Sequence, residues 1–140
     1  MTASFLSRAL RVKGLIASLT ILAAGASYAQ SAAPPAPLAE FPADALALSS
    51  KEITERLSGQ VFVGTSPTGI GYRAEYKSSG YVFVDLSNGA RDTGAWRAEE
   101  GRVCVEYRRF PSSCFEVRGN KDTLYSRRAD STEVRVMQTK

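Results

Sequence analysis

Eight short segments of alternating apolar and polar residues fill most of the chain after residue 59, and they constrain its fold more than any other feature. Strict alternation is the pattern of a strand with one buried face. Turn signals such as Asn88-Gly89 separate the segments at roughly even spacing, which is typical of an antiparallel meander. We therefore predict a mainly β fold, an up-and-down meander of about eight strands that forms a small closed barrel or a strongly curved sheet. The predicted strands cover residues 60–65, 71–77, 81–86, 93–98, 102–108, 113–118, 123–128 and 132–137.

The same alternation predicts which side chains face the core. Tyr72 and Tyr76 share one face of their segment, and charged residues occupy the other. In the last segment, Val134 and Val136 are expected inside and Arg135 outside. A charged outer face argues against an outer-membrane barrel, which needs a lipid-facing apolar band. The core residues that we single out are Tyr72, Tyr76, Trp96, Val103, Val105 and Phe115.

A short helix is predicted before the first strand. Ser49 precedes Glu52 by three residues, which is the spacing of a capping box. Ile53 and Leu57 lie four residues apart and form one apolar stripe, and Gly59 is suited to end the helix in a left-handed conformation. A helix this short is not stable alone, so we expect it to pack against the sheet as a flank or plug.

The first residues have the pattern of a cleaved secretory signal peptide. Three basic residues precede an apolar run over residues 15–26, and a site of small residues ends at Ala29. The run is shorter than the roughly 20 residues of a membrane span, so a retained anchor is the less favoured alternative. Gln30 follows the expected cleavage site, and a lipoprotein would need cysteine there. We predict a signal peptide over residues 1–29, a periplasmic or secreted location and no membrane span in the mature chain.

After the leader, a single domain is expected. Residues 30–48 hold four of the six prolines and many alanines. Proline lacks a backbone donor and restricts the residue before it, so this stretch is predicted to be a flexible or extended tether. Residues 49–140 are predicted to form one β-barrel-like domain.

Cys104 and Cys114 are the only cysteines, and they are predicted to form a disulfide. In a hairpin with its turn near Arg109, the two positions lie directly opposite each other on the face away from Val103 and Phe115. A non-hydrogen-bonded pair there brings the β-carbons within reach of a bridge. A redox or nucleophilic thiol is the alternative, but the chain has neither a CxxC motif nor a histidine to activate a thiolate.

The residue inventory argues against most catalytic chemistry. The chain has no histidine, which excludes Ser-His-Asp and Cys-His triads and argues against histidine-ligated metals. No DxDxDG calcium loop is present. Three of the 18 lysines and arginines lie in the leader and none of the 14 acidic residues does, so the mature chain is close to neutral and no nucleic-acid partner is expected. We predict no cofactor, no metal site and no enzymatic activity.

One catalytic signature does occur, in Asp92-Thr93-Gly94-Ala95, which matches that of the aspartic proteases. That chemistry requires two carboxylates that share a proton, and the chain has a single copy of the motif. Polar residues precede Asp92, where that family would imply apolar ones. We interpret Asp92 as a turn residue before the strand that carries Trp96.

A further set of residues resembles a family. Gly94-Ala95-Trp96-Arg97, then Gly101-Arg102-Val103-Cys104, then Cys114-Phe115-Glu116-Val117 are similar to the core of small exported bacterial proteins classed as a domain of unknown function. The resemblance covers roughly residues 48–136 and implies no known activity. Trp96 and the glycine two residues before it also resemble the motif of lipocalin-like barrels, although there the motif opens the first strand. Barrel-shaped periplasmic inhibitors of proteases or lysozyme share the size, the disulfide and the compartment.

These observations favour a non-enzymatic binding or cell-envelope module, whose partner would be an envelope protein or a small apolar ligand. The alternative is an inhibitor of an exported hydrolase, a protease or lysozyme, and an enzyme that uses carboxylates alone is the third class. A cavity of about 300 Å³ or more inside the barrel would favour a small ligand. A packed interior would favour contact with a protein through loops or the tether.

Overall fold

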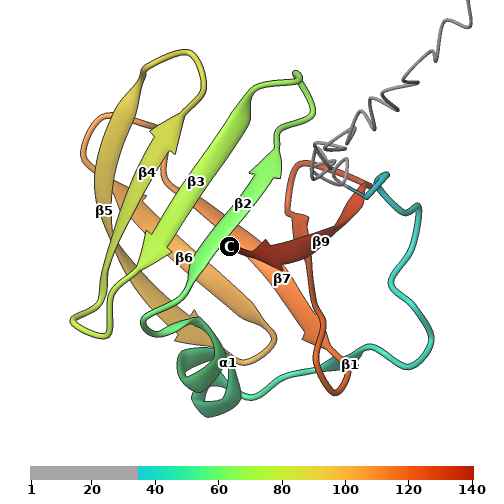
Figure 1. Ribbon diagram of the computed structural model, residues 1–140. Helices are drawn as coiled ribbons and strands as arrows, with labels where there is room; N and C mark the ends of the chain where they lie inside the picture. Colours follow the sequence, from blue (N-terminus) through green and yellow to red (C-terminus); the bar gives the residue numbers. More distant parts are fainter. Residues whose placement is uncertain (1–34) are drawn as a thin grey trace, which may run out of the picture. The chain divides into compact units, whose positions relative to one another are not determined.

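Eight antiparallel strands close into a barrel in the computed structural model, which describes residues 35–140 (Figure 1). The predicted signal peptide and residues 30–34 of the predicted tether lie outside the described residues. The mainly β fold with one short helix is therefore confirmed, in its closed form. The elements are β1 (Leu46–Ala47), α1 (Ser50–Leu57), β2 (Val61–Thr65), β3 (Gly71–Tyr76), β4 (Tyr81–Leu86), β5 (Arg91–Glu99), β6 (Arg102–Tyr107), β7 (Ser113–Gly119), β8 (Leu124–Arg128) and β9 (Val134–Thr139).

The sheet closes because its first and last long strands meet. Each strand from β2 to β9 pairs with the next along the chain, and β9 then pairs with β2. This last pairing joins only Phe62 to Thr139 and Val63 to Gln138. Among residues 35–140, the half of β2 that leads to Thr65 therefore has β3 as its only strand neighbour.

The helix α1 lies at one end of the barrel, next to β5 and β6 (Figure 1). The Ser49 side chain accepts the backbone N–H of Glu52, and the Glu52 carboxylate accepts that of Ser49, so the predicted capping box is present. Ile53 and Leu57 are fully buried and join the core. The apolar stripe of α1 thus closes this end, and the turns at the other end leave the interior open.

Residues 35–48 do not behave as a free tether. Leu38 forms a β-bridge with Val134, and β1 pairs with the end of β7 that β6 leaves unpaired. Ala45 is buried. We expected a tether separate from the fold, and for these residues that expectation is corrected. Their backbone groups pair with strands of the barrel, and one of their apolar side chains is buried.

The orientation of β9 also differs from the prediction. Alternation placed Val134 and Val136 in the core, but Arg135 and Met137 are the residues that line the interior. The register agrees, because Arg135 pairs with Ser126, which also lines the interior. Val134 is nevertheless fully buried, and Leu38 lies beside it in the sheet, paired with it through two backbone hydrogen bonds.

An aromatic contact also attaches residues 35–48 to the outer surface of the barrel. The Phe41 ring lies beneath two guanidinium groups, with the Arg118 Cζ 4.6 Å and the Arg127 Cζ 4.9 Å from the ring centroid. Such cation–π contacts are favourable even at exposed sites.

Within residues 35–140, no helix combines the length and the apolar sequence that crossing a membrane would require.

The predicted disulfide between Cys104 and Cys114 is present. The two residues are direct cross-strand partners of β6 and β7, and their Cα atoms are 4.0 Å apart. This close spacing is that of a non-hydrogen-bonded antiparallel pair, as the hairpin geometry predicted. The bridge lies on the outer face, because Val103 and Val105 on either side of Cys104 belong to the core cluster.

Replacing both cysteines by alanine is expected to lower the free energy of unfolding by about 2–3 kcal/mol, because the bridge closes a short loop in the unfolded chain. Urea unfolding of the oxidised protein and the double variant measures this difference. Mass spectrometry of the protein, purified without reductant, that found two free thiols would contradict the bridge itself.

Gly94 is expected to tolerate no side chain. A β-carbon at this position would lie 2.7 Å from the carbonyl oxygen of Glu106 and 3.0 Å from the Val105 side chain. Gly94→Ala should therefore cost about 1–3 kcal/mol of stability. Gly71→Ala is the matched control, because its β-carbon would make an ordinary 3.5 Å contact with Ser87. Equal unfolding midpoints for the two variants would show that the close approach does not matter.

Candidate ligand-binding site

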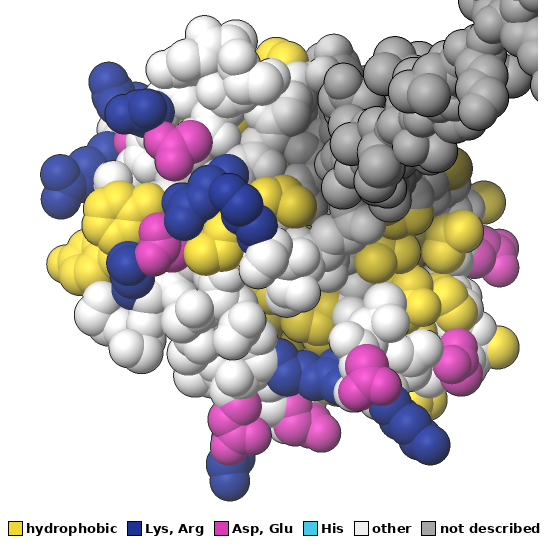
Figure 2. Space-filling view, viewed as in Figure 1, with side chains coloured by type: hydrophobic (Ala, Val, Ile, Leu, Met, Phe, Trp, Pro, Cys, Tyr) yellow, Lys and Arg dark blue, Asp and Glu magenta, His cyan; other side chains and the backbone are white. Residues whose placement is uncertain are grey.

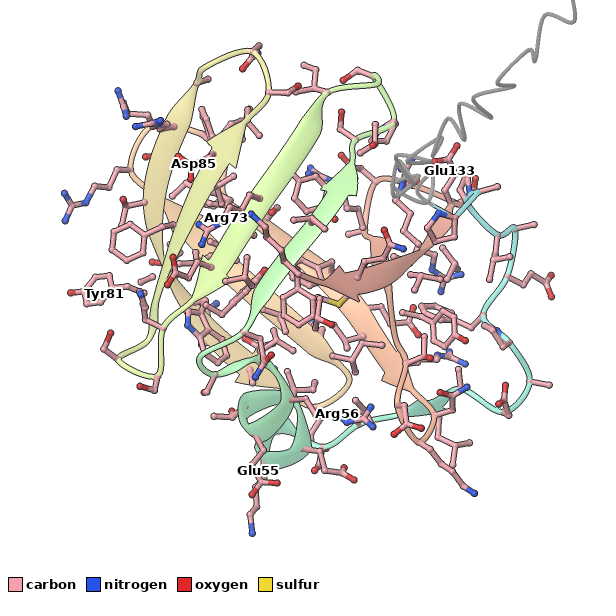
Figure 3. The ribbon with its side chains drawn as sticks, in the orientation of Figure 1. Glu55, Arg56, Arg73, Tyr81, Asp85 and Glu133 are labelled. Atoms are coloured by element: carbon pink, nitrogen blue, oxygen red, sulfur yellow. A yellow bond between two sulfur atoms is a disulfide. The ribbon has the colours of Figure 1, made fainter. Side chains whose placement is uncertain are left out.

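The open end of the barrel leads into an interior cavity of about 400 Å³. Its rim is formed by the β2–β3, β6–β7 and β8–β9 turns, at the end away from α1. Figure 3 shows the two ends, with Glu133 beside the rim and Arg56 on α1. The walls are largely apolar and aromatic: Phe62, Pro67, Ile70, Tyr72, Ala74, Tyr76, Val84, Leu86, Tyr107, Phe110, Pro111, Phe115 and Met137.

An aromatic cluster forms the floor of this cavity. The Phe62 and Tyr76 rings meet edge to face with centroids 5.8 Å apart, and Tyr76 meets Trp96 in the same way at 5.4 Å. The Trp96 indole N–H donates to the Lys77 carbonyl at 3.0 Å, which satisfies its only polar group. Tyr76 and Trp96 are both buried, so the floor is rigid and packed against the core under α1.

The six residues singled out from the sequence divide between this floor, the core and the cavity wall. Tyr76, Trp96, Val103 and Val105 are buried members of the core cluster. Tyr72 and Phe115 are half-buried, pack against that cluster and line the cavity.

Tyr72 shapes the wall together with Gly64, its cross-strand partner. A β-carbon at position 64 would lie 2.7 Å from the Tyr72 hydroxyl oxygen, so the ring occupies the space above the glycine. Burial raises the pKa of Tyr72, and the nearby Arg135 guanidinium opposes this only in part. The phenol therefore remains protonated at neutral pH and can donate a hydrogen bond.

Tyr107 occupies a similar position across the cavity. Burial raises the pKa of its phenol and the Arg128 guanidinium lowers it, with smaller increases from Asp92 and Tyr72. Its ring packs against Phe110 in the β6–β7 turn, with centroids 5.9 Å apart. An arginine thus lowers the pKa of each of these two tyrosines, against the effect of burial.

Arg135 and Arg128 bring positive charge to a lining that also contains Glu133 and several serines and threonines. The Arg135 guanidinium donates to the Thr65 carbonyl, across the seam where β2 and β9 are no longer paired, and to the Glu133 carboxylate at 2.6 Å. The Arg128 Nε donates to Asp130 at 3.0 Å. Sequence analysis did not identify either arginine as a site residue. For Arg135 the signal was misleading, because the apolar residues beside it, Val134 and Val136, lie on the face of β9 away from the cavity.

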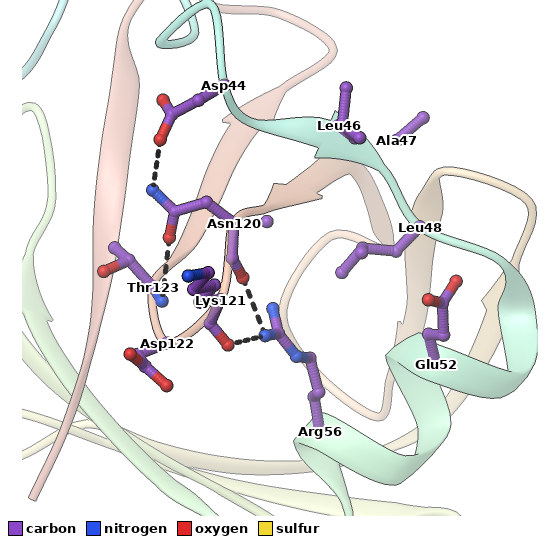
Figure 4. A pocket seen from close by; sticks show the side chains of 11 residues that line it. Asp44, Leu46, Ala47, Leu48, Glu52, Arg56, Asn120, Lys121, Asp122 and Thr123 are labelled. Carbon is purple, nitrogen blue, oxygen red and sulfur yellow. Dashed lines mark hydrogen bonds between the residues drawn. The ribbon is translucent and has the colours of Figure 1, made fainter.

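A second hollow, an open groove of about 680 Å³, lies beside α1 at the closed end (Figure 4). The Arg56 guanidinium donates to the carbonyls of Asn120 and Lys121, and the Asn120 side chain donates to Asp44 at 3.0 Å. These bonds attach the β7–β8 turn to α1, although the Arg56 Nη1 atom is buried without a hydrogen-bond partner among residues 35–140. Side chains of both signs of charge line the groove. The barrel cavity has the concave aromatic lining that small-molecule sites require.

The residue of the protease-like motif has a structural role next to the rim. The Asp92 carboxylate is buried within β5 and accepts the backbone N–H groups of Thr93, Arg109 and Phe110 at 2.7–2.8 Å. It therefore lies in a strand instead of the predicted turn, and it holds the β6–β7 turn against β5.

In residues 35–140, no group of three acidic, cysteine or histidine side chains is arranged to bind a metal ion.

Asp92 is expected to contribute pH-dependent stability. Burial raises the pKa of its carboxyl, but the three backbone N–H donors and Arg109 outweigh this and hold the pKa below its usual value. A lowered folded pKa means that the stabilisation is present above the unfolded value of about 3.9 and is lost as the pH falls through the folded pKa. Asp92→Asn should lower the unfolding temperature at pH 7, and the difference from the wild type should shrink towards pH 3. Asp130→Asn, at an exposed aspartate, is the control and should change little at either pH.

Comparison of the chain with models of protein families, with curated proteins and with solved structures found no significant match.

Proposed function

We propose that this protein is an exported, non-enzymatic binding module that holds a small, mainly apolar ligand inside its barrel. The observation that carries the proposal is the cavity of about 400 Å³, whose aromatic floor and open rim lie within one closed barrel. Its volume is in the range of ligand pockets, and a few polar groups interrupt an apolar lining, as in such pockets. A barrel of eight strands is just wide enough to enclose one small ligand.

Export to the periplasm or the medium is part of this proposal. The disulfide between Cys104 and Cys114 supports it, because such bridges persist in oxidising compartments. The leader pattern over residues 1–29 supports it independently. The resemblance to small exported bacterial proteins is consistent with both.

Inhibition of an exported hydrolase is the second candidate, and an exposed aromatic patch on β4 favours it. Tyr81 and Phe83 are 49% and 42% exposed on the outer face of the barrel. They lie beside ion pairs of Arg73 with Glu75 and Asp85. Figure 2 shows apolar side chains among basic and acidic groups on the left of the view, where Figure 3 labels Tyr81. Exposed tyrosine and phenylalanine with charged neighbours are typical of protein interfaces.

Binding of an uncharged apolar probe tests the ligand proposal. N-phenyl-1-naphthylamine should bind saturably to the oxidised protein, with one site per chain. Ala74→Phe fills space inside the cavity, because Ala74 is a buried lining residue, and it should abolish saturable binding. Ala95→Phe is the matched control on the exposed outer face of β5 and should leave binding unchanged. The proposal fails if the probe does not bind, or if both variants bind it as the wild type does.

Replacement of Tyr81 and Phe83 by serine separates the two candidates. A ligand-binding barrel should keep its affinity for the probe, since neither side chain lines the cavity. If the protein instead inhibits a secreted protease or lysozyme, and the double variant loses that inhibition while retaining its fold by circular dichroism, the second candidate is the better description.

A further inference from the structure

Polarity is distributed unevenly along the cavity. The floor consists of Phe62 and Tyr76, whereas the charged lining residues, Arg128, Glu133 and Arg135, come from β8, β9 and the turn that joins them. A ligand with one apolar and one polar end would therefore have a defined orientation, with its apolar body on the aromatic floor and its polar end at β8–β9.

The charged lining favours an anion at that end. Two guanidinium groups and one carboxylate line the cavity, and the carboxylate of Glu133 is already engaged by Arg135. A guanidinium has five N–H donors. Arg135 uses its Nη1 and Nη2 atoms for Thr65 and Glu133, and Arg128 uses its Nε and Nη2 atoms for Asp130. The Nε of Arg135 and the Nη1 of Arg128 remain available to a ligand.

The acidic partners do not cancel this preference. The side chains of Asp130 and Glu133 are 71% and 43% exposed, so water screens both ion pairs. The Arg135 side chain is only 26% exposed, and its link to the Thr65 carbonyl holds the guanidinium at the seam between β2 and β9. A carboxylate arriving from the cavity would meet a positioned cation that is partly shielded from water, where charge-assisted hydrogen bonds are strong.

Two neutral donors lie next to the same cations. The Tyr72 phenol is close enough to Arg135, and the Tyr107 phenol to Arg128, for each arginine to lower the pKa of its neighbour, yet burial keeps both phenols protonated. Both rings line the cavity. Each arginine–tyrosine pair can therefore present a charged and a neutral donor to one oxyanion.

We propose that the ligand is a monocarboxylate with an apolar body, such as a fatty acid, whose carboxylate is bound by Arg135 and Arg128 while its body lies on the Phe62–Tyr76 floor. This inference rests on the proposed function of the cavity and adds the chemical class of the ligand. Tyr72 and Tyr107 supply further hydrogen bonds to the same carboxylate.

Three probes of equal chain length test the assignment. Decanoate, decanol and decyltrimethylammonium are each titrated into the oxidised protein, with displacement of N-phenyl-1-naphthylamine as the readout. Fluorescence of Trp96, the only tryptophan, is a second readout because its ring contacts Tyr76 on the cavity floor. Decanoate should bind on the order of tenfold more tightly than decanol, which corresponds to about 1.4 kcal/mol. The ammonium compound should bind most weakly.

Removing the charges should weaken binding of the carboxylate probe and leave binding of the neutral probe unchanged. Arg135→Gln and Arg128→Gln should each bring the affinity for decanoate close to that for decanol and leave decanol binding unchanged. Arg128→Gln is the safer variant, because Arg135 also bonds the Thr65 carbonyl across the seam. Arg108→Gln is the matched control, since Arg108 is in the β6–β7 turn at the same end but does not line the cavity.

The outcomes separate this inference from the proposed function. Equal affinities for decanoate and decanol, or equal losses for the Arg108 and Arg128 variants, overturn the carboxylate assignment and leave an apolar binding site. Preference for the ammonium probe also overturns it, in favour of Glu133 as the polar contact. If N-phenyl-1-naphthylamine and all three probes fail to bind, the proposed function itself is wrong.

Discussion

The pairing of β2 with β9 is the contact on which the interior of this protein depends. It joins two residues of each strand, and without it the eight strands would form an open curved sheet with two exposed edges. Because the pairing is confined to the end near α1, the strands separate towards the rim, and the Arg135 guanidinium bridges the remaining seam to Thr65. The residue that completes the barrel is thus also the cation of the candidate site.

The two ends of the barrel are stabilised by different means, and this difference creates the site. At one end, Ile53 and Leu57 of α1 fill the interior with apolar side chains. At the other, polar interactions hold the turns, with Asp92 accepting the backbone N–H groups of the β6–β7 turn that carries Phe110. Hydrogen bonds of this kind fix a turn without filling the space beneath it. The rim therefore surrounds a cavity, whereas the other end of the barrel is filled by apolar side chains of α1.

Alternation allowed most of the strands to be predicted, because a strand with one buried face has a strict period of two. The prediction from alternation failed at β9, where the apolar residues Val134 and Val136 lie on the face away from the cavity. Leu38 pairs with Val134 at the edge of β9, although the proline-rich composition around Leu38 suggested a tether. Asp92 was expected in a turn but lies in β5, and its hydrogen bonds to Arg109 and Phe110 depend on a turn 17 or 18 residues away.

The sequence by itself determined the mainly β fold, the capped helix before it and the pairing of Cys104 with Cys114, since each follows from local periodicity or from register across one hairpin. Only the tertiary structure decided that the barrel closes, that residues 38–47 pack on its outer surface and that a cavity remains inside. These features depend on contacts between segments far apart in the chain, and a local pattern of apolar and polar residues cannot specify which of two distant surfaces will cover it. The orientation of Arg135 follows the same rule, because its place in the interior depends on the register of β9 against β8.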